Sequence, residues 1–381
     1  YEGDLKIETL IKRFMFTAFI EQTIGQNKES SNAFENMASF YKQFLITGKG
    51  ENDAKFFVDR IKKDKRYESL QGSIALDLRI EGLIATKDIT AIQFADTFEC
   101  LAVNIISRIA TGLTQRSLEF DSFERIIMNR CNSMWYEKHK DEYGVLLATV
   151  RFLRYLDNPI AKGLTLNEYV HKYTEEYYKI DTEYRRAVTC YRNLENPSDE
   201  FEILMDTVEH SYQIKFLDVL GPEYSKVLAM QKDWTFAGSD MSEDFYRLIQ
   251  RNPTKKMFVI ISDALRYEIG REIFDKIKVN KVLKGGAEIK YMVSPLPSIT
   301  SFGMASLLPH KTIGYEGKQL FVDGMPTGSI KARDAILKAK NPNFAAISYD
   351  EINDMTQKEL RSYCSDKTLV YIYHDVMDNA G

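Results

Sequence analysis

The sequence predicts an α + α/β protein, with an all-helical N-terminal region in residues 1–240 and a mainly parallel sheet covered by helices in residues 241–381. Three observations predict this. Up to about residue 240, prolines are few and apolar residues recur at three- and four-residue spacing, which is typical of helices. Met257–Ser262 is a continuous apolar, β-branched run, as in a strand buried on both faces. Strand-like and helix-like stretches then alternate.

The helical region carries apolar stripes that predict buried helix faces. At 381 residues the chain is too long for one compact core, so we expect two or three domains, with a break between helical subdomains near residues 155–165. One stripe lies within residues 89–113, at Phe94, Phe98, Leu101, Ile105 and Ile109. Another leads toward Trp135, at Phe120, Phe123, Ile127 and Cys131.

A row of tyrosines occupies residues 167–194, at Tyr169, Tyr173, Tyr177, Tyr184 and Tyr191, with Ile180 among them. Aromatic faces can stack on the bases of a nucleic acid, but a helix that packs its aromatic face into a bundle core is the favoured interpretation. The basic cluster Lys62, Lys63, Lys65 and Arg66 is likewise interpreted as a solvated helix end in preference to a phosphate contact.

The C-terminal part alternates in the manner of a doubly covered parallel sheet. Strands are predicted at Met257–Ser262, Ile289–Val293, Gln319–Val322, Phe344–Ser348 and Thr368–Tyr373, and helices at Ala264–Lys278 and Ile330–Lys340. Ligands of such sheets bind beyond the carboxyl ends of the strands, so the polar residues there are the candidates for chemistry.

Asp263 directly follows the first of these strands. It predicts either a helix N-cap, the favoured interpretation of the residue alone, or a metal ligand. Arg266 and Glu268 follow within one helical turn and are more typical of a helix surface than of a catalytic site.

Hydroxyl groups precede a small-residue helical run in residues 294–309. A hydroxyl at a helix N-terminus lies where backbone N–H groups favour an anion, which suits a Thr or Ser nucleophile that attacks phosphorus. N-capping by Ser298 or Thr300 explains this segment equally well.

A last strand ends in three possible metal ligands, His374, Asp375 and Asp378. Imidazole and oxygen donors without a thiolate suit zinc, manganese or another divalent ion. Such a metal would lower the pKa of the Thr300 hydroxyl and polarise a phosphoryl oxygen. The three segments together indicate phosphoryl or sulfuryl ester transfer.

Four stretches resemble the PglZ family of bacterial BREX phage-defence systems: ISDALRYE, PSITSFGMASLLPHK, VDGMPTGSIKARDAIL and YIYHDVMDNAG, all within about residues 240–381. The resemblance implies the first half of an alkaline-phosphatase-like domain whose complete site holds two metal ions, with Zn or Mn expected. Asp263, His374, Asp378 and Thr300 would be its metal ligands, and Thr300 its nucleophile. Arg266 is a weak candidate for substrate binding, and the resemblance assigns no firm role to Asp323.

The resemblance also implies an unfinished site. The chain stops at Gly381, before the next metal ligand of the D-x-x-G motif, and it lacks the later Asp-His-Gly segment. His310 and His210 have no setting that would replace it. The sequence also begins without Met. We therefore expect a fragment that holds half a site and is inactive alone.

Three functions are compatible with these features. The first is a metal-dependent phosphatase or phosphodiesterase, including a nuclease, that uses a Thr nucleophile. The second is an assembly platform whose helical region docks other BREX proteins. The third, a sulfatase, ranks low because no C/S-x-P-x-R sequence surrounds Thr300.

Composition restricts the setting of the chain. A net charge of −4 argues against a protein whose whole surface binds nucleic acid. It does not exclude a local basic groove, so nucleic acid stays a candidate partner. Four scattered cysteines indicate reduced thiols in a cytoplasm, which the resemblance implies is bacterial, and no apolar run is long enough for a membrane.

Overall fold

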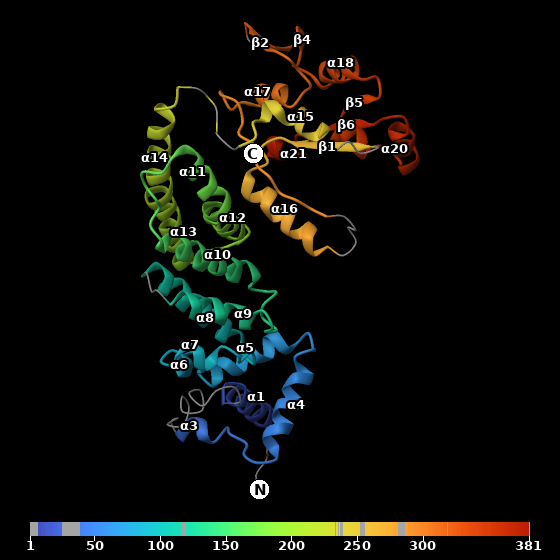
Figure 1. The fold of residues 1–381 in the computed structure, drawn as a ribbon. Helices are drawn as coiled ribbons and strands as arrows, with labels where there is room; N and C mark the ends of the chain where they lie inside the picture. Colours follow the sequence, from blue (N-terminus) through green and yellow to red (C-terminus); the bar gives the residue numbers. More distant parts are fainter. Residues whose placement is uncertain are drawn as a thin grey trace. The chain divides into compact units, whose positions relative to one another are not determined.

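The computed structural model describes residues 7–24, 39–115, 119–232, 234, 236, 239–251, 256–280, 286–317 and 319–380. Two compact units divide the chain. The first comprises Tyr1–Ala161 with Lys179–Leu220, and the second comprises Lys162–Tyr178 with Gly221–Gly381. The fold class is the predicted one, an N-terminal helical region followed by a parallel sheet with helices (Figure 1).

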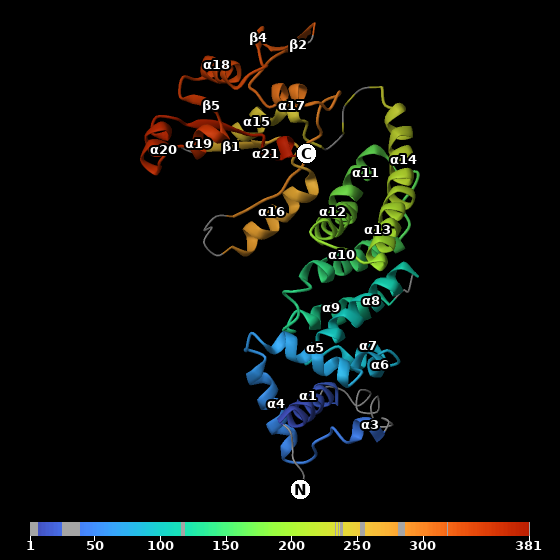
Figure 2. The same cartoon turned by 180° about the vertical axis from the view of Figure 1, so that it is seen from behind.

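The first unit is built from helices, and α1 and α4 lie side by side in it (Figures 1 and 2). Its elements are α1 (Ile7–Ile24), α3 (Ser39–Lys42), α4 (Gly50–Ile61), α5 (Tyr67–Asp77), α6 (Ile80–Ile84), α7 (Ile89–Ile92), α8 (Glu99–Thr114), α9 (Phe120–Arg130), α10 (Lys140–Asp157), α12 (Tyr178–Arg192), α13 (Asp199–Ser211) and η2 (Tyr212–Leu217), while α14 (Asp218–Ala229) leads out of it.

The apolar stripe of residues 89–113 is buried as predicted, although the helix that carries it is interrupted. Phe98, Leu101, Ile105 and Ile109 are fully buried. α7 ends at Ile92 and α8 begins at Glu99, so Gln93–Phe98 is not helical. A side chain of α9 stabilises the interruption, because the buried Arg130 donates to the carbonyl oxygens of Gln93 and Ala95 at 3.3 and 2.6 Å.

The tyrosine row packs mainly inward. It runs through α11 (Leu166–Lys172), the π-helical turn η1 (Tyr173–Tyr177) and α12. Tyr169 and Tyr177 are buried, and the ring of Tyr184 stacks on Tyr212 with their centroids 3.9 Å apart. These contacts confirm the favoured interpretation of the row as a packing face.

The second unit contains a parallel three-stranded sheet in the order β1-β6-β5, formed by β1 (Met257–Ser262), β6 (Leu369–His374) and β5 (Phe344–Ser348). Three predicted strands are therefore confirmed, but β1 is not buried on both faces as predicted, because Phe258 and Ile260 on one face have exposed fractions of 51% and 68%. Its other elements are α11, η1, η3 (Ser242–Asp244), α15 (Phe245–Gln250), α16 (Tyr267–Val279), α17 (Thr300–Ser306), β2 (Ile313–Glu316), β3 (Gln319–Val322), β4 (Met325–Pro326), α18 (Ile330–Lys340), α19 (Tyr349–Asn353), α20 (Gln357–Cys364) and α21 (Val376–Ala380).

Three expectations about this unit are corrected. Ile289–Val293 is not a strand, because within it only Val293 makes a bridge, to Met241. Gln319–Val322 is a strand, but it pairs antiparallel with β2 and β4 in a separate sheet. The helix predicted from Ala264 begins at Tyr267, because Ala264 has a left-handed backbone with φ of 58° and Arg266 is extended.

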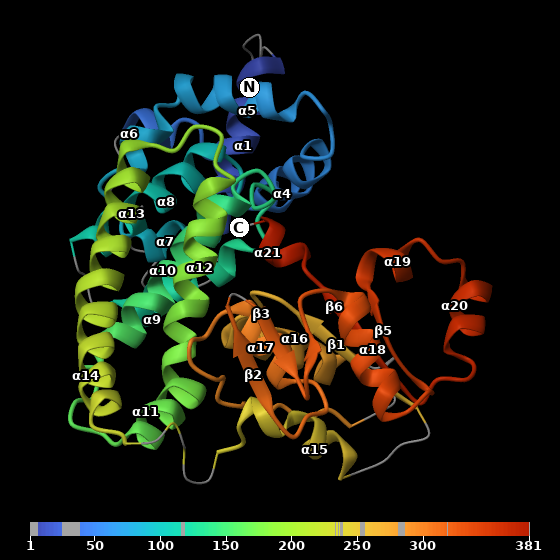
Figure 3. The same ribbon diagram turned by 90° about the horizontal axis from the view of Figure 1, so that it is seen from above.

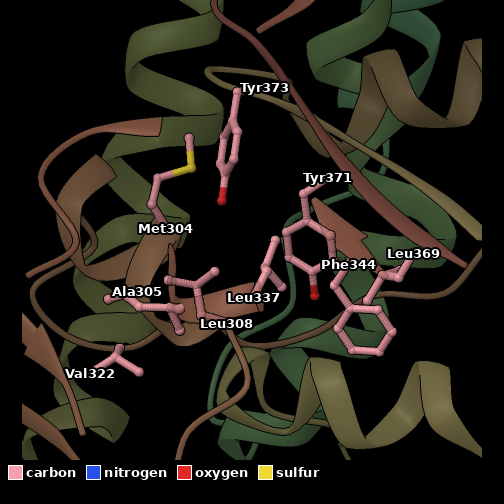
Figure 4. Close-up of a cluster of buried hydrophobic side chains, with 10 residues drawn as sticks. Met304, Ala305, Leu308, Val322, Leu337, Phe344, Leu369, Tyr371 and Tyr373 are labelled. Atoms are coloured by element: carbon pink, nitrogen blue, oxygen red, sulfur yellow. The ribbon is translucent and has the colours of Figure 1, made fainter. Parts of the chain in front are cut away.

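One face of the parallel sheet forms the core of the second unit. Tyr371 and Tyr373 on β6 lie with Met304 of α17 and Leu337 of α18 in this core, and Val322 adds a contribution from β3 (Figure 4). α17 and α18 lie near the sheet in the view from above (Figure 3). The core therefore fixes α17, which carries Thr300, to the sheet that carries the other candidate residues.

Candidate active site

Two of the predicted strand-end residues lie next to each other. Ser262 pairs in register with His374, since β1 and β6 are neighbouring parallel strands. Beyond this pair the backbone N–H of Asp263 donates to the carbonyl oxygen of His374 at 2.9 Å. The carboxyl edge of the sheet thus brings Asp263 and His374 together, as the parallel topology predicts.

His374 is oriented by two neighbours. Its Nδ1 lies 2.9 Å from the Ser262 hydroxyl oxygen, and the Tyr349 ring meets the imidazole edge to face with centroids 4.8 Å apart. When Nδ1–H donates to Ser262, the lone pair of Nε2 is free for a metal, an arrangement typical of metal-binding histidines. Ser262 was not a predicted site residue, and its only signal is its place at the end of the strand.

The side chain of Asp263 does not cap α16. Its Oδ1 accepts a hydrogen bond from the backbone N–H of Ala264 at 3.0 Å, and the N-cap position of α16 belongs to Arg266. The N-cap interpretation of Asp263 is therefore wrong. The Arg266 side chain is exposed and makes no capping hydrogen bond, whereas Glu268 in the first turn is buried.

Thr300 is the first residue of α17, and its side chain is exposed. The N-cap position belongs to Ile299 and no side chain caps this helix, so capping by Ser298 or Thr300 is also wrong. The far end of α17 is anchored, because the Tyr371 hydroxyl donates to the Leu307 carbonyl at 2.9 Å. An exposed hydroxyl is thus carried by a firmly attached helix.

Asp378 follows β6 on the short helix α21 and is exposed, as is Asp375. Across the part of the chain that the structure describes, no three or more His, Cys, Asp or Glu residues form a group that could hold a metal ion. Asp263 and His374 fit a divalent ion in donor type, but Asp378 does not join them in such a group. Gly381 lies outside the described residues.

Asp323 closes a loop. Its backbone lies in the left-handed region, with φ of 47°. Its carboxylate accepts hydrogen bonds from the backbone N–H groups of Thr312 at 2.9 Å and Lys311 at 3.1 Å. These bonds, that from Thr312 above all, hold the pKa of Asp323 below its ordinary value. The contacts describe a structural residue that joins the segment after α17 to the turn after β3.

A match to a known domain gives the class of the part of the second unit that holds the parallel sheet. Residues 244–381 match the family model described as the BREX system PglZ alkaline phosphatase-like domain. This segment is an alkaline phosphatase-like domain, and the family to which it belongs is PglZ.

Two curated proteins extend the likeness into the helical region. The chain is 30% identical over 324 residues to the alkaline phosphatase-like protein PglZ of Bacillus cereus (strain H3081.97). The aligned residues make up 83% of this chain and 38% of that protein. It is 28% identical over 364 residues to the alkaline phosphatase-like protein BrxZ of Escherichia coli O9:H4 (strain HS), covering 89% of this chain and 42% of that protein.

The chain therefore spans about two fifths of the length of these relatives. No solved structure matches it. In the described residues, no helix has both the length and the apolar character needed to cross a membrane.

Proposed function

We propose that this chain is part of a BREX-system protein that hydrolyses phosphate esters with the help of divalent metal ions, in the bacterial cytoplasm. The observation that carries the proposal is the hydrogen bond from the Asp263 N–H to the His374 carbonyl, since it joins the main chains of two possible metal-ligating residues at the carboxyl edge of a parallel sheet. The match of residues 244–381 to an alkaline phosphatase-like domain supports the same chemistry.

In this proposal Asp263, His374 and Asp378 belong to the metal site, with Zn or Mn as the ion and Thr300 beside it. When bound, the metal would stabilise negative charge that develops on a phosphoryl oxygen. Among the described residues no three possible ligands form a group, so two metal positions would need further donors.

Thr300 would act as the nucleophile. Its Oγ forms a bond to phosphorus, the bond from phosphorus to the leaving oxygen breaks, and the hydroxyl proton passes to solvent or to the departing oxygen. Water then attacks the phosphothreonine, which releases phosphate or a phosphate monoester and restores the hydroxyl. The exposure of Thr300 and its freedom from any capping role support this assignment.

The test compares Thr300→Ala with Ser301→Ala in the full-length protein. Ser301 is the next residue of α17 and is also exposed, so it controls for changes to the helix. Hydrolysis of bis(p-nitrophenyl) phosphate with Mn or Zn should fall by a factor on the order of 10³ or more in Thr300→Ala only. A Thr300→Ala protein that keeps its activity would rule out the nucleophile.

A groove on the first unit favours a second function, the docking of other BREX proteins. It has a volume of about 550 Å³ and lies between α5, α6 and α8. Its apolar rim includes Leu76 and Val103, whose exposed fractions are 76% and 51%. Exposed apolar side chains gathered at one groove are typical of a protein contact.

Leu76→Asp tests this docking function, with Ile203→Asp on α13 as the matched control because Ile203 is exposed but does not line the groove. Co-purification with other BREX proteins should be lost in Leu76→Asp alone. Equal partner recovery from both variants would contradict docking at this groove.

A further inference from the structure

A second cavity, of about 270 Å³, lies in the second unit. Segments distant in the sequence supply its walls: α11 and η1, the stretch before η3, α16, and residues 289–291. Neither Asp263, Thr300 nor His374 lines it, so it is distinct from the candidate active site. The lining residues that matter here are Glu175, Asp240, Tyr267, Arg271, Lys290 and Tyr291.

Arg271 presents a positioned cation to this cavity. Its guanidinium carbon lies 5.6 Å from the ring centre of Tyr178 and 5.7 Å from that of Phe274. Aromatic contacts of this kind hold a guanidinium plane in place. Its Nε is buried and has no hydrogen-bond partner among the described residues. Because Arg271 lines the cavity, its charged guanidinium can donate to an oxyanion that enters it.

Tyrosine rings make one wall rigid. The Tyr267 hydroxyl donates to the carbonyl oxygen of Thr174 at 3.2 Å, and its ring contacts Tyr173 and Tyr178 at 6.2 and 5.8 Å between centroids. Burial raises the pKa of the Tyr267 hydroxyl, so this group remains a neutral donor at physiological pH. The Tyr291 hydroxyl lies 3.4 Å from that of Ser239.

The cavity is lined by charges of both signs, which restricts the chemical groups that a ligand can carry. Arg271 and Lys290 attract an oxyanion, and among the described residues Lys290 forms an exposed ion pair with Glu288 at 3.2 Å. Glu175 and Asp240 instead call for a ligand with hydroxyl or N–H donors. Inorganic phosphate cannot provide an aromatic ring or a sugar. A nucleotide provides a phosphate, sugar hydroxyls and a planar base.

The size of the cavity points to a single nucleotide unit. Pockets for drug-sized ligands measure about 300 to 1,000 Å³, and this cavity lies just below that range. We propose that it binds a mononucleotide, with the phosphate at Arg271 and Lys290, the base against the tyrosine wall, and sugar or base donors toward Glu175 and Asp240. This binding does not require the proposed hydrolase activity or its metal ions.

The test is calorimetric titration of the 381-residue chain in EDTA with adenosine 5′-monophosphate, adenosine and inorganic phosphate. The mononucleotide should bind more tightly than either fragment. Arg271→Gln should weaken its binding about tenfold or more, since a charge-assisted hydrogen bond is lost. Arg247→Gln is the matched control, because Arg247 is an exposed arginine of α15 that does not line the cavity.

Two results would overturn the proposal. One is inorganic phosphate binding as tightly as the mononucleotide, and the other is a folded Arg271→Gln protein with unchanged affinity. If Arg271→Gln unfolds, Lys290→Gln takes its place, because that exposed side chain can be replaced without loss of packing. Unchanged affinity there would overturn the proposal equally. Since EDTA removes metal ions, failure here leaves the proposed phosphate ester hydrolysis untouched.

Discussion

The backbone N–H of Asp263 donates to the carbonyl oxygen of His374 at 2.9 Å, although 111 positions separate the two residues in the sequence. This bond continues the pairing of β1 with β6 by one residue beyond Ser262. Because it involves only the main chain, either side chain can be replaced while the strand pairing stays. Variants at this edge of the sheet therefore report on ligand chemistry more than on folding.

Ser262→Ala should weaken metal binding in the full-length protein by about tenfold to a hundredfold, because the serine hydroxyl orients the His374 imidazole. Competition between the protein and a chelator for Zn or Mn measures this. Ser365→Ala is the control, since that hydroxyl only bonds the nearby Ser362 carbonyl. Equal affinity in the two variants would show that His374 is not a ligand oriented by Ser262.

Asp323→Asn should lower the thermal stability of the chain at pH 7. The folded-state pKa of Asp323 is depressed, so the stability it contributes is present above its unfolded pKa and is lost as the pH falls through the folded pKa. Asn tolerates the left-handed backbone, so the substitution removes mainly the charge.

Melting curves from pH 7 to pH 3 provide the measurement for Asp323. The difference between wild type and Asp323→Asn should begin to shrink below about pH 4, where the unfolded chain takes up the proton, and should continue to shrink as the pH falls through the lower folded-state pKa. Asp354→Asn, at an exposed aspartate after α19, is the control. A difference in melting temperature that stays constant with pH would argue against an ionic role.

The elements that could be predicted from the sequence are those with an unmistakable local pattern. β1 and α18 were predicted with the bounds they have, because an apolar β-branched run and a regular helical period depend only on nearby residues. β3 was predicted as a strand but assigned to the main sheet. Its partners are β2 and β4, and strand pairing is a tertiary property that local periodicity does not contain.

The same limit applies to the candidate site. Asp263 and His374 could be predicted to meet, because parallel strands end at one edge of the sheet. The contact between Ser262 and His374 could not, since it depends on the register of two strands separated by more than 100 residues. The backbone of Ala264, left-handed at φ of 58°, also has no clear sequence signal, and it delays the start of α16.

Tyr371→Phe should destabilise the second unit by about 1 kcal/mol, because the Leu307 carbonyl loses the hydroxyl that donates to it. Tyr373→Phe is a close control on the same strand. The Tyr373 hydroxyl is buried without a hydrogen-bond partner in the described part of the chain, so its removal should be neutral or stabilising. Urea unfolding of both variants measures the difference. Equal destabilisation would show that the bond to α17 contributes nothing.

Arg130→Met should destabilise the first unit by about 3 kcal/mol, because the Gln93 and Ala95 carbonyls lose their donor inside the protein. Arg125→Met on the same helix is the control, since Arg125 is exposed and its loss should change the free energy of unfolding by no more than about 0.5 kcal/mol.

The fluorescence of Trp135 measures the unfolding of this unit. In a Trp234→Phe background Trp135 is the remaining tryptophan, and its indole donates to the Asp96 carbonyl within the same interruption at 2.8 Å. Urea unfolding followed by its fluorescence therefore reports on this unit. Matching midpoints for the two arginine variants would mean that Arg130 does not hold the break between α7 and α8.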